Sequence, residues 1–330
     1  MTKTITTPSL CFEHRAIRLL CLFRISDFDI PIWLRRQALI GLAVIFLGLA
    51  LGSSVEAGEV SIVDDFGHTV TLPSPARRII ALYGAYNEIL GAMGLEGRIV
   101  GRTKADRLPP SILSSPSIGT HMRPSVEIIL ALKPDLILQS AGRREAVVAV
   151  EQLRKKGIPL ALFNPENLEG LVSVIRRMGV LTGEEQAAGR LIQSMQERLA
   201  RVESLLQGVK DRPRVFFEVR YPNLLAAGRG SIVHDIIQRA GGVNCLEDRK
   251  RMVRIGMESL IQRNPAAYVV QKGPMNRNPS PPWERPHFGV LDAVKKRRVL
   301  FVDEQIFSRP GPRSVDAVES LAAFLHPDRF

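Results

Sequence analysis

Short apolar runs alternate with helical patterns from residue 60 onward. Runs 60–63 and 68–72 flank a turn at Gly67 and predict a hairpin. Further strands are predicted at 78–82, 98–101, 135–139, 159–163, 214–219, 267–271 and 299–302. Helical spacing predicts helices at 85–93, 125–132, 143–156, 168–181, 232–239, 257–263 and 313–325. This alternation of strand and helix predicts an α/β fold with mostly parallel sheets and helices on both faces.

One helix is much longer than the rest. Thr182-Gly183-Glu184 opens a helical pattern that runs to about Leu206, and Gly208 and Pro213 end it. Its apolar stripe consists of Ala188, Leu191, Ile192, Met195, Leu199, Val202 and Leu206. The simplest interpretation is two Rossmann-like α/β lobes joined by this helix. The expected boundaries are a leader at 1–57, an N-terminal lobe at 58–166, connecting helices at 167–209 and a C-terminal lobe at 210–330.

The leader has the features of a cleavable signal peptide. Arg35-Arg36 precede an uncharged apolar run at 38–51, and small residues lie at Val55 and Ala57. The run is shorter than a membrane span, so we expect cleavage after Ala57 rather than an uncleaved anchor. No cysteine follows the run, which predicts a periplasmic protein without a lipid anchor. Residues 1–34 do not fit a signal peptide, and we hypothesise that translation starts near Leu34.

The cysteine content and the charge narrow the range of possible partners and ligands. Cys11 and Cys21 lie in the leader, so Cys245 remains alone and is expected to be a buried small residue. The chain carries a net charge of +12, and without residues 1–57 it keeps 39 basic and 29 acidic residues, a net charge of +10. Basic runs are short, such as Arg249-Lys250-Arg251, and the longest has four residues, at 295–298. Scattered charge of this kind indicates an anionic small ligand and no nucleic-acid partner.

Two segments of the chain echo each other. Glu127 lies seven residues before Pro134, and Glu258 lies seven residues before Pro265; each proline ends a predicted helix ahead of a strand. A glutamate in a first helical turn is favourable against the helix dipole, which is the simple explanation. Two copies, one in each lobe, also predict a pair of acidic knobs related by approximate symmetry.

Four blocks in this order carry a family resemblance. They are 64–73 with 75–82, 87–94 with 99–101, 118–137, and 231–242 with 258–265 and 299–303. Together they make the chain resemble the cobalamin and iron-complex periplasmic binding proteins of ABC importers. The resemblance implies a ligand cleft between the lobes and a single rigid connecting helix that limits its closure. It also implies that Glu127 and Glu258 dock onto arginines of a permease dimer, which a cytoplasmic ATPase drives.

Candidate ligand-binding residues follow from the expected cleft. In open α/β sheets the ligand lies beyond the carboxyl ends of the strands. The residues predicted there are Tyr83, Tyr86, Arg102, His121, Arg123, Arg143, Arg220, Tyr221, Met252, Phe307 and Arg309. Arginine supplies paired donors to carboxylate or catecholate oxygens, although each arginine alone can equally be a solvated surface charge. We therefore expect the bound ligand to be a ferric siderophore or a corrinoid. The protein itself is expected to be a monomer without a cofactor of its own.

His121 raises the question of metal ligation. By its spacing from Glu127, His121 matches a position that supplies a ligand-facing aromatic in cobalamin binders of the family. Haem binders of the family place a tyrosine ligand one residue earlier, where this chain has Thr120. His121 with Tyr83 or Tyr221 can complete the coordination of ferric iron, or it can line the cleft without ligation. The other histidines show no paired spacing, which disfavours capture of a bare metal ion.

Other classes of function have weaker support. Gly228-Arg229-Gly230-Ser231 before a helix could cradle a phosphate, but the rest of a dinucleotide or P-loop motif is absent. No catalytic motif is found, so we predict that the chain is not an enzyme. The alternatives are a haem-binding importer component, a periplasmic ligand sensor, and an α/β enzyme without a familiar motif.

Overall fold

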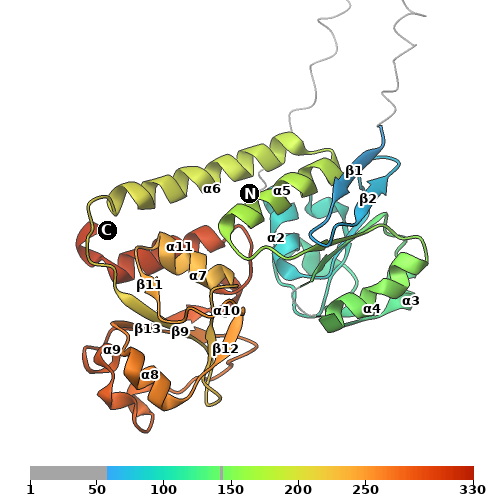
Figure 1. Cartoon of the computed structure of the whole chain (residues 1–330). Helices are drawn as coiled ribbons and strands as arrows, with labels where there is room; N and C mark the ends of the chain where they lie inside the picture. Colours follow the sequence, from blue (N-terminus) through green and yellow to red (C-terminus); the bar gives the residue numbers. More distant parts are fainter. Residues whose placement is uncertain (1–57, 142–143) are drawn as a thin grey trace, which may run out of the picture. The chain divides into compact units, whose positions relative to one another are not determined.

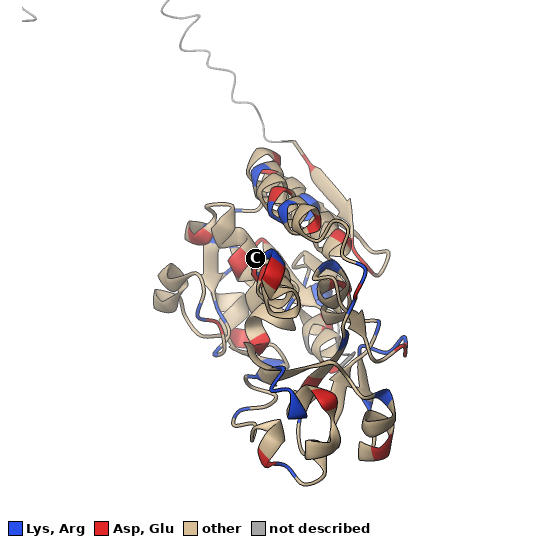
Figure 2. Ribbon diagram, turned by 90° about the vertical axis from the view of Figure 1, so that its left-hand side faces the viewer, with Lys and Arg blue, Asp and Glu red and all other residues tan. Residues whose placement is uncertain are grey.

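The computed structural model describes residues 58–141 and 144–330. The predicted leader at 1–57 and Arg143 lie outside these residues. Within them no helix has both the length and the apolar character that crossing a membrane requires. Lys and Arg are interspersed with Asp and Glu along the ribbon, as Figure 2 shows, which agrees with the scattered charge of the sequence.

The N-terminal lobe is built on a parallel sheet with strand order β4-β3-β7-β8. Its strands are β3 (Ile79–Ala81), β4 (Ile99–Gly101), β7 (Leu136–Ser140) and β8 (Leu160–Phe163). The helices of this lobe are α2 (Gly84–Ala92), α3 (Val126–Ala131) and α4 (Arg144–Lys155). The remaining elements are β1 (Val60–Val63), β2 (Thr69–Leu72), β5 (Gly119–Thr120), β6 (Arg123–Pro124), η1 (Glu96–Arg98) and η2 (Pro110–Ser114). Strands β3 and β8 are buried along their whole length, which explains their continuous apolar runs.

The C-terminal lobe contains a mixed sheet with strand order β12-β10-β9-β13-β14, and β11 also pairs with β9. Its strands are β9 (Arg214–Arg220), β10 (Leu225–Ala227), β11 (Val243–Asn244), β12 (Met252–Arg254), β13 (Ala267–Lys272) and β14 (Val299–Asp303). Its helices are α7 (Ile232–Arg239), α8 (Met257–Arg263), α9 (Asp292–Lys295), α10 (Glu304–Phe307) and α11 (Ser314–Leu325), with short turns η3 (Pro282–Glu284), η4 (Phe288–Val290) and η5 (Pro327–Arg329). The antiparallel strands β10 and β12 were not predicted, because runs of three residues show no period. The predicted fold class, two α/β lobes joined by one long helix, is confirmed.

Helices α5 (Leu168–Thr182) and α6 (Glu185–Leu205) connect the lobes, and Figure 1 shows α6 running along both of them. Every residue of the predicted stripe is either buried in the main hydrophobic core or packed against it. Arg98 in the N-terminal lobe pairs with Glu184 at the start of α6, at 2.5 Å. Arg198 pairs with both Asp316 and Glu319 of α11, at 2.6 and 2.5 Å. The connecting helix is therefore tied to both lobes.

A fully buried ion pair organises the C-terminal lobe. Glu218 of β9 and Arg285 are within hydrogen-bonding distance, and their side chains are 0% and 1% exposed. The Tyr268 hydroxyl donates to the same carboxylate at 2.6 Å, and the Asn276 amide donates to it at 3.3 Å. Burial, followed by the Glu218 charge, raises the pKa of Tyr268 well above its ordinary value. The guanidinium also lies 4.0 Å from the centre of the Tyr221 ring. This network attaches the 273–291 segment to the sheet.

Replacing Glu218 by Gln should destabilise the protein strongly. The change leaves the Arg285 guanidinium buried without a counter-charge, which costs about 3–5 kcal/mol in comparable sites. Glu319→Gln is the matched control, since this glutamate pairs with an arginine that is 41% exposed, and the loss should stay below about 1 kcal/mol. Urea unfolding of both variants measures the difference. Equal losses would contradict a structural role for the buried pair.

Candidate ligand site

A cavity of about 380 Å³ lies between the two lobes. Residues of the N-terminal lobe that line it are Tyr83, His121, Ser140 and Ala146. Residues of the C-terminal lobe that line it are Val219, Ala227, Ser231, Ile232, Val233, Arg251, Met252, Pro274, Met275, Glu304, Ser308 and Arg309. The lining thus combines aliphatic surface with a few convergent polar groups, as small-molecule sites do.

The cavity lies at the carboxyl ends of the parallel strands. Tyr83 follows β3, Ser140 ends β7, and Glu304 follows β14. Two helices begin at the cavity, because Tyr83 is the N-cap of α2 and Ser231 is the N-cap of α7. The amino end of a helix carries partial positive charge, so both helices favour an anion in this space.

Two arginines add full positive charge. Arg251 and Arg309 both line the cavity from the C-terminal lobe. Burial raises the pKa of the Tyr83 phenol above its ordinary value, while the charges of Arg309 and Arg251 act in the opposite direction. The phenol is therefore protonated at neutral pH and can donate a hydrogen bond. Two cations beside a phenol form a site suited to carboxylate or catecholate oxygens.

His121 lies in the turn between β5 and β6, and its backbone carbonyl accepts a hydrogen bond from Gln139 at 3.1 Å. It shares the cavity lining with Tyr83, whereas Tyr221 packs under Arg285 in the C-terminal lobe. No group of three His, Cys, Asp or Glu side chains within residues 58–141 and 144–330 can hold a metal ion. Any metal contact from His121 and Tyr83 would thus complete a shell that the ligand mostly supplies.

The C-terminal wall of the cavity is held by hydrogen bonds. The backbone N–H of Met275 donates to the Glu304 carboxylate at 2.7 Å, and the Ser308 hydroxyl donates to Gln271. Asn276, in the same turn as Met275, donates to the buried Glu218. The network around Glu218 therefore extends to the edge of the cavity.

Glycines 228 and 230 position the loop that carries Arg251. The backbone N–H of Gly228 donates to the Arg251 carbonyl at 3.0 Å, and that of Gly230 donates to the Lys250 carbonyl at 3.3 Å. A Cβ atom at Gly228 would lie 2.2 Å from the Lys250 carbonyl oxygen. This close approach of two backbones explains the Gly-x-Gly sequence. Because these N–H groups are engaged by the loop, the motif does not present them to a phosphate.

The structure places the predicted ligand-binding residues in two groups. Tyr83, His121, Met252 and Arg309 lie in the cavity lining. The other described ones lie elsewhere: Tyr86, Phe307, Arg102, Arg123, Arg220 and Tyr221. Tyr86 is fully buried and donates to the Phe163 carbonyl at 3.1 Å. Phe307 stacks on Phe217, so it belongs to the core as well.

Arg102 and Arg123 lie outside the cavity lining. Arg102 donates to the Thr103 and Leu113 carbonyls at 3.2 and 3.4 Å, and Arg123 is exposed on β6. Sequence reasoning missed Arg251 and Glu304, which do line the cavity. The basic run at 249–251 was a signal for Arg251, but no local pattern marks which of its residues faces inward.

Both acidic knobs are exposed. Glu127 lies in the first turn of α3 and Glu258 in the first turn of α8. In the part of the chain that the structure describes, neither carboxylate forms an ion pair. Figure 1 shows α3 and α8 on different lobes, both away from α6.

Cys245 is buried, and burial raises the pKa of its thiol, which suits a packing role.

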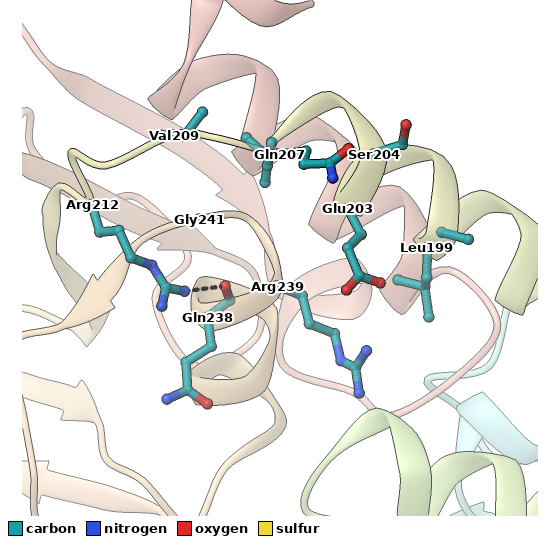
Figure 3. Close-up of a pocket in the computed structure, with 11 residues that line it drawn as sticks. Leu199, Glu203, Ser204, Gln207, Val209, Arg212, Gln238, Arg239 and Gly241 are labelled. Atoms are coloured by element: carbon teal, nitrogen blue, oxygen red, sulfur yellow. Dashed lines mark hydrogen bonds between the residues drawn. The ribbon is translucent and has the colours of Figure 1, made fainter.

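A second hollow, of about 700 Å³, lies between the end of α6 and α7. Figure 3 shows Glu203 and Arg239 pointing into it, while Arg212 donates to the Gln238 carbonyl at 2.8 Å. Arg212 therefore satisfies a backbone carbonyl near the end of α7. The hollow lies away from the carboxyl ends of the strands, so we assign the candidate site to the smaller cavity between the lobes.

Comparisons with known proteins agree on one family. Residues 79–306 match the family described as periplasmic binding protein. An uncharacterized ABC transporter substrate-binding lipoprotein, YvrC of Bacillus subtilis, is 29% identical over 83% of this chain and 88% of its own length. A vitamin B12-binding protein of Vibrio cholerae is 25% identical over 77% of this chain and 90% of its own. The structure of the periplasmic heme-binding protein RhuT from Roseiflexus, in apo form, is 26% identical, with a TM-score of 0.67 over 77% of this chain and 100% of its own.

Replacing Gly228 by Ala should disturb the Arg251 loop. The added methyl group meets a backbone oxygen that no side-chain rotation can move, and overpacking of this kind costs about 1–3 kcal/mol. Gly189→Ala is the control, because Gly189 is exposed in α6 with no atom within 4 Å of the new Cβ. That change should stabilise the protein by about 0.5–1 kcal/mol. Denaturant unfolding measures both, and a stable Gly228→Ala variant would contradict the tight contact.

Proposed function

This chain belongs to the periplasmic binding protein family, and we propose that it captures an anionic iron chelate and delivers it to an ABC importer. The observation that carries the proposal is the cavity between the lobes, where Arg251 and Arg309 lie with Tyr83 and His121. The amino ends of α2 and α7 add positive potential to the same space. The protein itself performs no chemistry in this role, which is to bind, to dock and to release.

The size and the charge of the cavity favour a compact anion. Its volume of about 380 Å³ is near the lower end of the roughly 300–1,000 Å³ typical of ligand pockets. A ferric siderophore with exposed catecholate or carboxylate oxygens suits two guanidinium groups. A corrinoid is larger and prefers flat aromatic walls, and this lining contains one tyrosine, Tyr83, and no phenylalanine or tryptophan. Haem is the alternative ligand. Its two carboxylates suit the two arginines, and Tyr83 and His121, which can ligate iron, both line the cavity.

Delivery depends on Glu127 and Glu258. Both are exposed in the first turns of helices, one on each lobe, with no internal counter-charge in the described chain. They are free to pair with arginines of a permease dimer, one on each subunit. This pairing favours an importer component over a ligand sensor. A monomer in the periplasm, released by cleavage after Ala57, is the form that we propose to dock.

The bound ligand can be identified directly. Protein purified from its native periplasm without added ligand should carry a coloured iron complex, seen by absorption and by native mass spectrometry. Iron with a siderophore mass supports the proposal. Cobalt with a corrinoid mass, or the sharp Soret band of haem, would replace the proposed ligand class with one of its alternatives.

Charge reversal should separate docking from binding. Glu127→Lys with Glu258→Lys should abolish ligand uptake, because like charges at a docking contact cost several kcal/mol. Ligand affinity should stay within about twofold of wild type, since both residues lie outside the cavity lining. Glu185→Lys, in the exposed first turn of α6, is the matched control and should transport normally. Normal uptake by the double variant would refute the docking role.

A further inference from the structure

One arginine of the cavity reaches from the C-terminal lobe to the N-terminal lobe. Arg251 donates from its Nη1 to the Oδ1 of Asn164 at 2.8 Å. Arg251 lines the cavity, whereas Asn164, which follows β8, does not. Within the described residues this is the one hydrogen bond found for the Arg251 side chain. Most of its five N–H donors are therefore available to another acceptor.

The partner of this arginine is neutral. An amide oxygen accepts one hydrogen bond from a guanidinium, whereas a carboxylate or catecholate accepts two parallel ones and brings a negative charge. An anionic group in the cavity is thus a better partner for Arg251 than Asn164 is. Arg309, the second arginine, lies near a carboxylate, because a Cβ atom at Gly84 would lie 3.3 Å from its Nη1 and 2.8 Å from the Oδ1 of the buried Asp106. Of the two arginines, Arg251 is the one with the weaker competing partner.

The backbone around Arg251 is fixed on both sides. Its carbonyl accepts from Gly228, and the next residue, Met252, pairs with Ala227 in the β10–β12 ladder. Asn164 is fixed too, because its backbone N–H donates to Asp65 at 2.6 Å. A change of partner at Arg251 therefore needs only a rotation of its side chain.

We propose that Arg251 selects anionic ligands and that Asn164 competes with them for its guanidinium. This inference rests on the proposed function, and it adds a specificity residue and its competitor. The neutral side chain at position 164 sets the strength of the competition. An aspartate there would hold Arg251 too tightly, and an alanine would release it.

The test uses Asn164→Asp, Asn164→Ala and a matched control. Asn167→Asp adds the same charge three residues away, at the N-cap of α5, where aspartate caps as well as asparagine. The probes are ferric citrate, a ferric tris-catecholate and haemin as anions, and cyanocobalamin, which carries no net charge. Calorimetric titration of the mature protein gives each affinity, and thermal unfolding checks that the variants are folded.

Asn164→Asp should weaken binding of the anionic probe by about tenfold, which corresponds to about 1.4 kcal/mol. Asn164→Ala should strengthen it by about twofold to tenfold, the effect of losing one ordinary hydrogen bond. Asn167→Asp should bind like wild type. Wild-type affinity in Asn164→Asp, or an equal loss in Asn167→Asp, would overturn this inference alone. Binding of cyanocobalamin but of no anionic probe by wild type would overturn the proposed ligand class and this inference with it.

Discussion

The spacing of the two lobes depends on the contacts that hold α6 to each of them. At one end Arg98 donates to Glu184 and to the Ala76 and Thr182 carbonyls. Further along, Arg198 binds Glu319 through two nitrogens and Asp316 through one. A helix of 21 residues is about 31 Å long, and its apolar stripe packs on the core along its length. Packed interfaces resist continuous deformation, so these contacts restrain the spacing of the two lobes.

A second contact fixes the lobes on the side of α2. Glu88 of α2 accepts two hydrogen bonds from Arg313, at 2.6 and 2.8 Å. These bonds raise the pKa of Arg313, and both side chains are partly buried, which protects the pair from screening. Asp235 of α7 also accepts from the backbone N–H of Leu168 at the start of α5, at 2.8 Å. With these contacts in place, adjustment to a ligand falls on side chains of the cavity more than on movement of the lobes.

The sequence predicted those parts of the fold that are marked by a long pattern of apolar residues within one segment. The stripe of α6 has seven apolar positions at helical spacing, and a buried face follows directly from them. For the candidate site, the position after a strand pointed to Tyr83, which lines the cavity, whereas Tyr86 three residues later is buried in the core. The sequence of this nine-residue helix offers no rule for which of the two tyrosines faces the cavity. Arg251 and Glu304 depend on contacts with Gly228 and Met275, distant in sequence, which no pattern shows.

The same constraint connects the cavity to the proposed docking surface. Glu127 and Glu258 lie on different lobes, so the distance between them is a measure of the lobe spacing. Because the ties of α6 and the Glu88–Arg313 pair hold that spacing, the two carboxylates are pre-organised for a partner with two matching cations. Pre-organisation spares the conformational entropy that association would otherwise lose. Under the proposed function, a permease that contacts both carboxylates together would recognise this geometry, and the ligand would be held within it by side chains that can exchange partners.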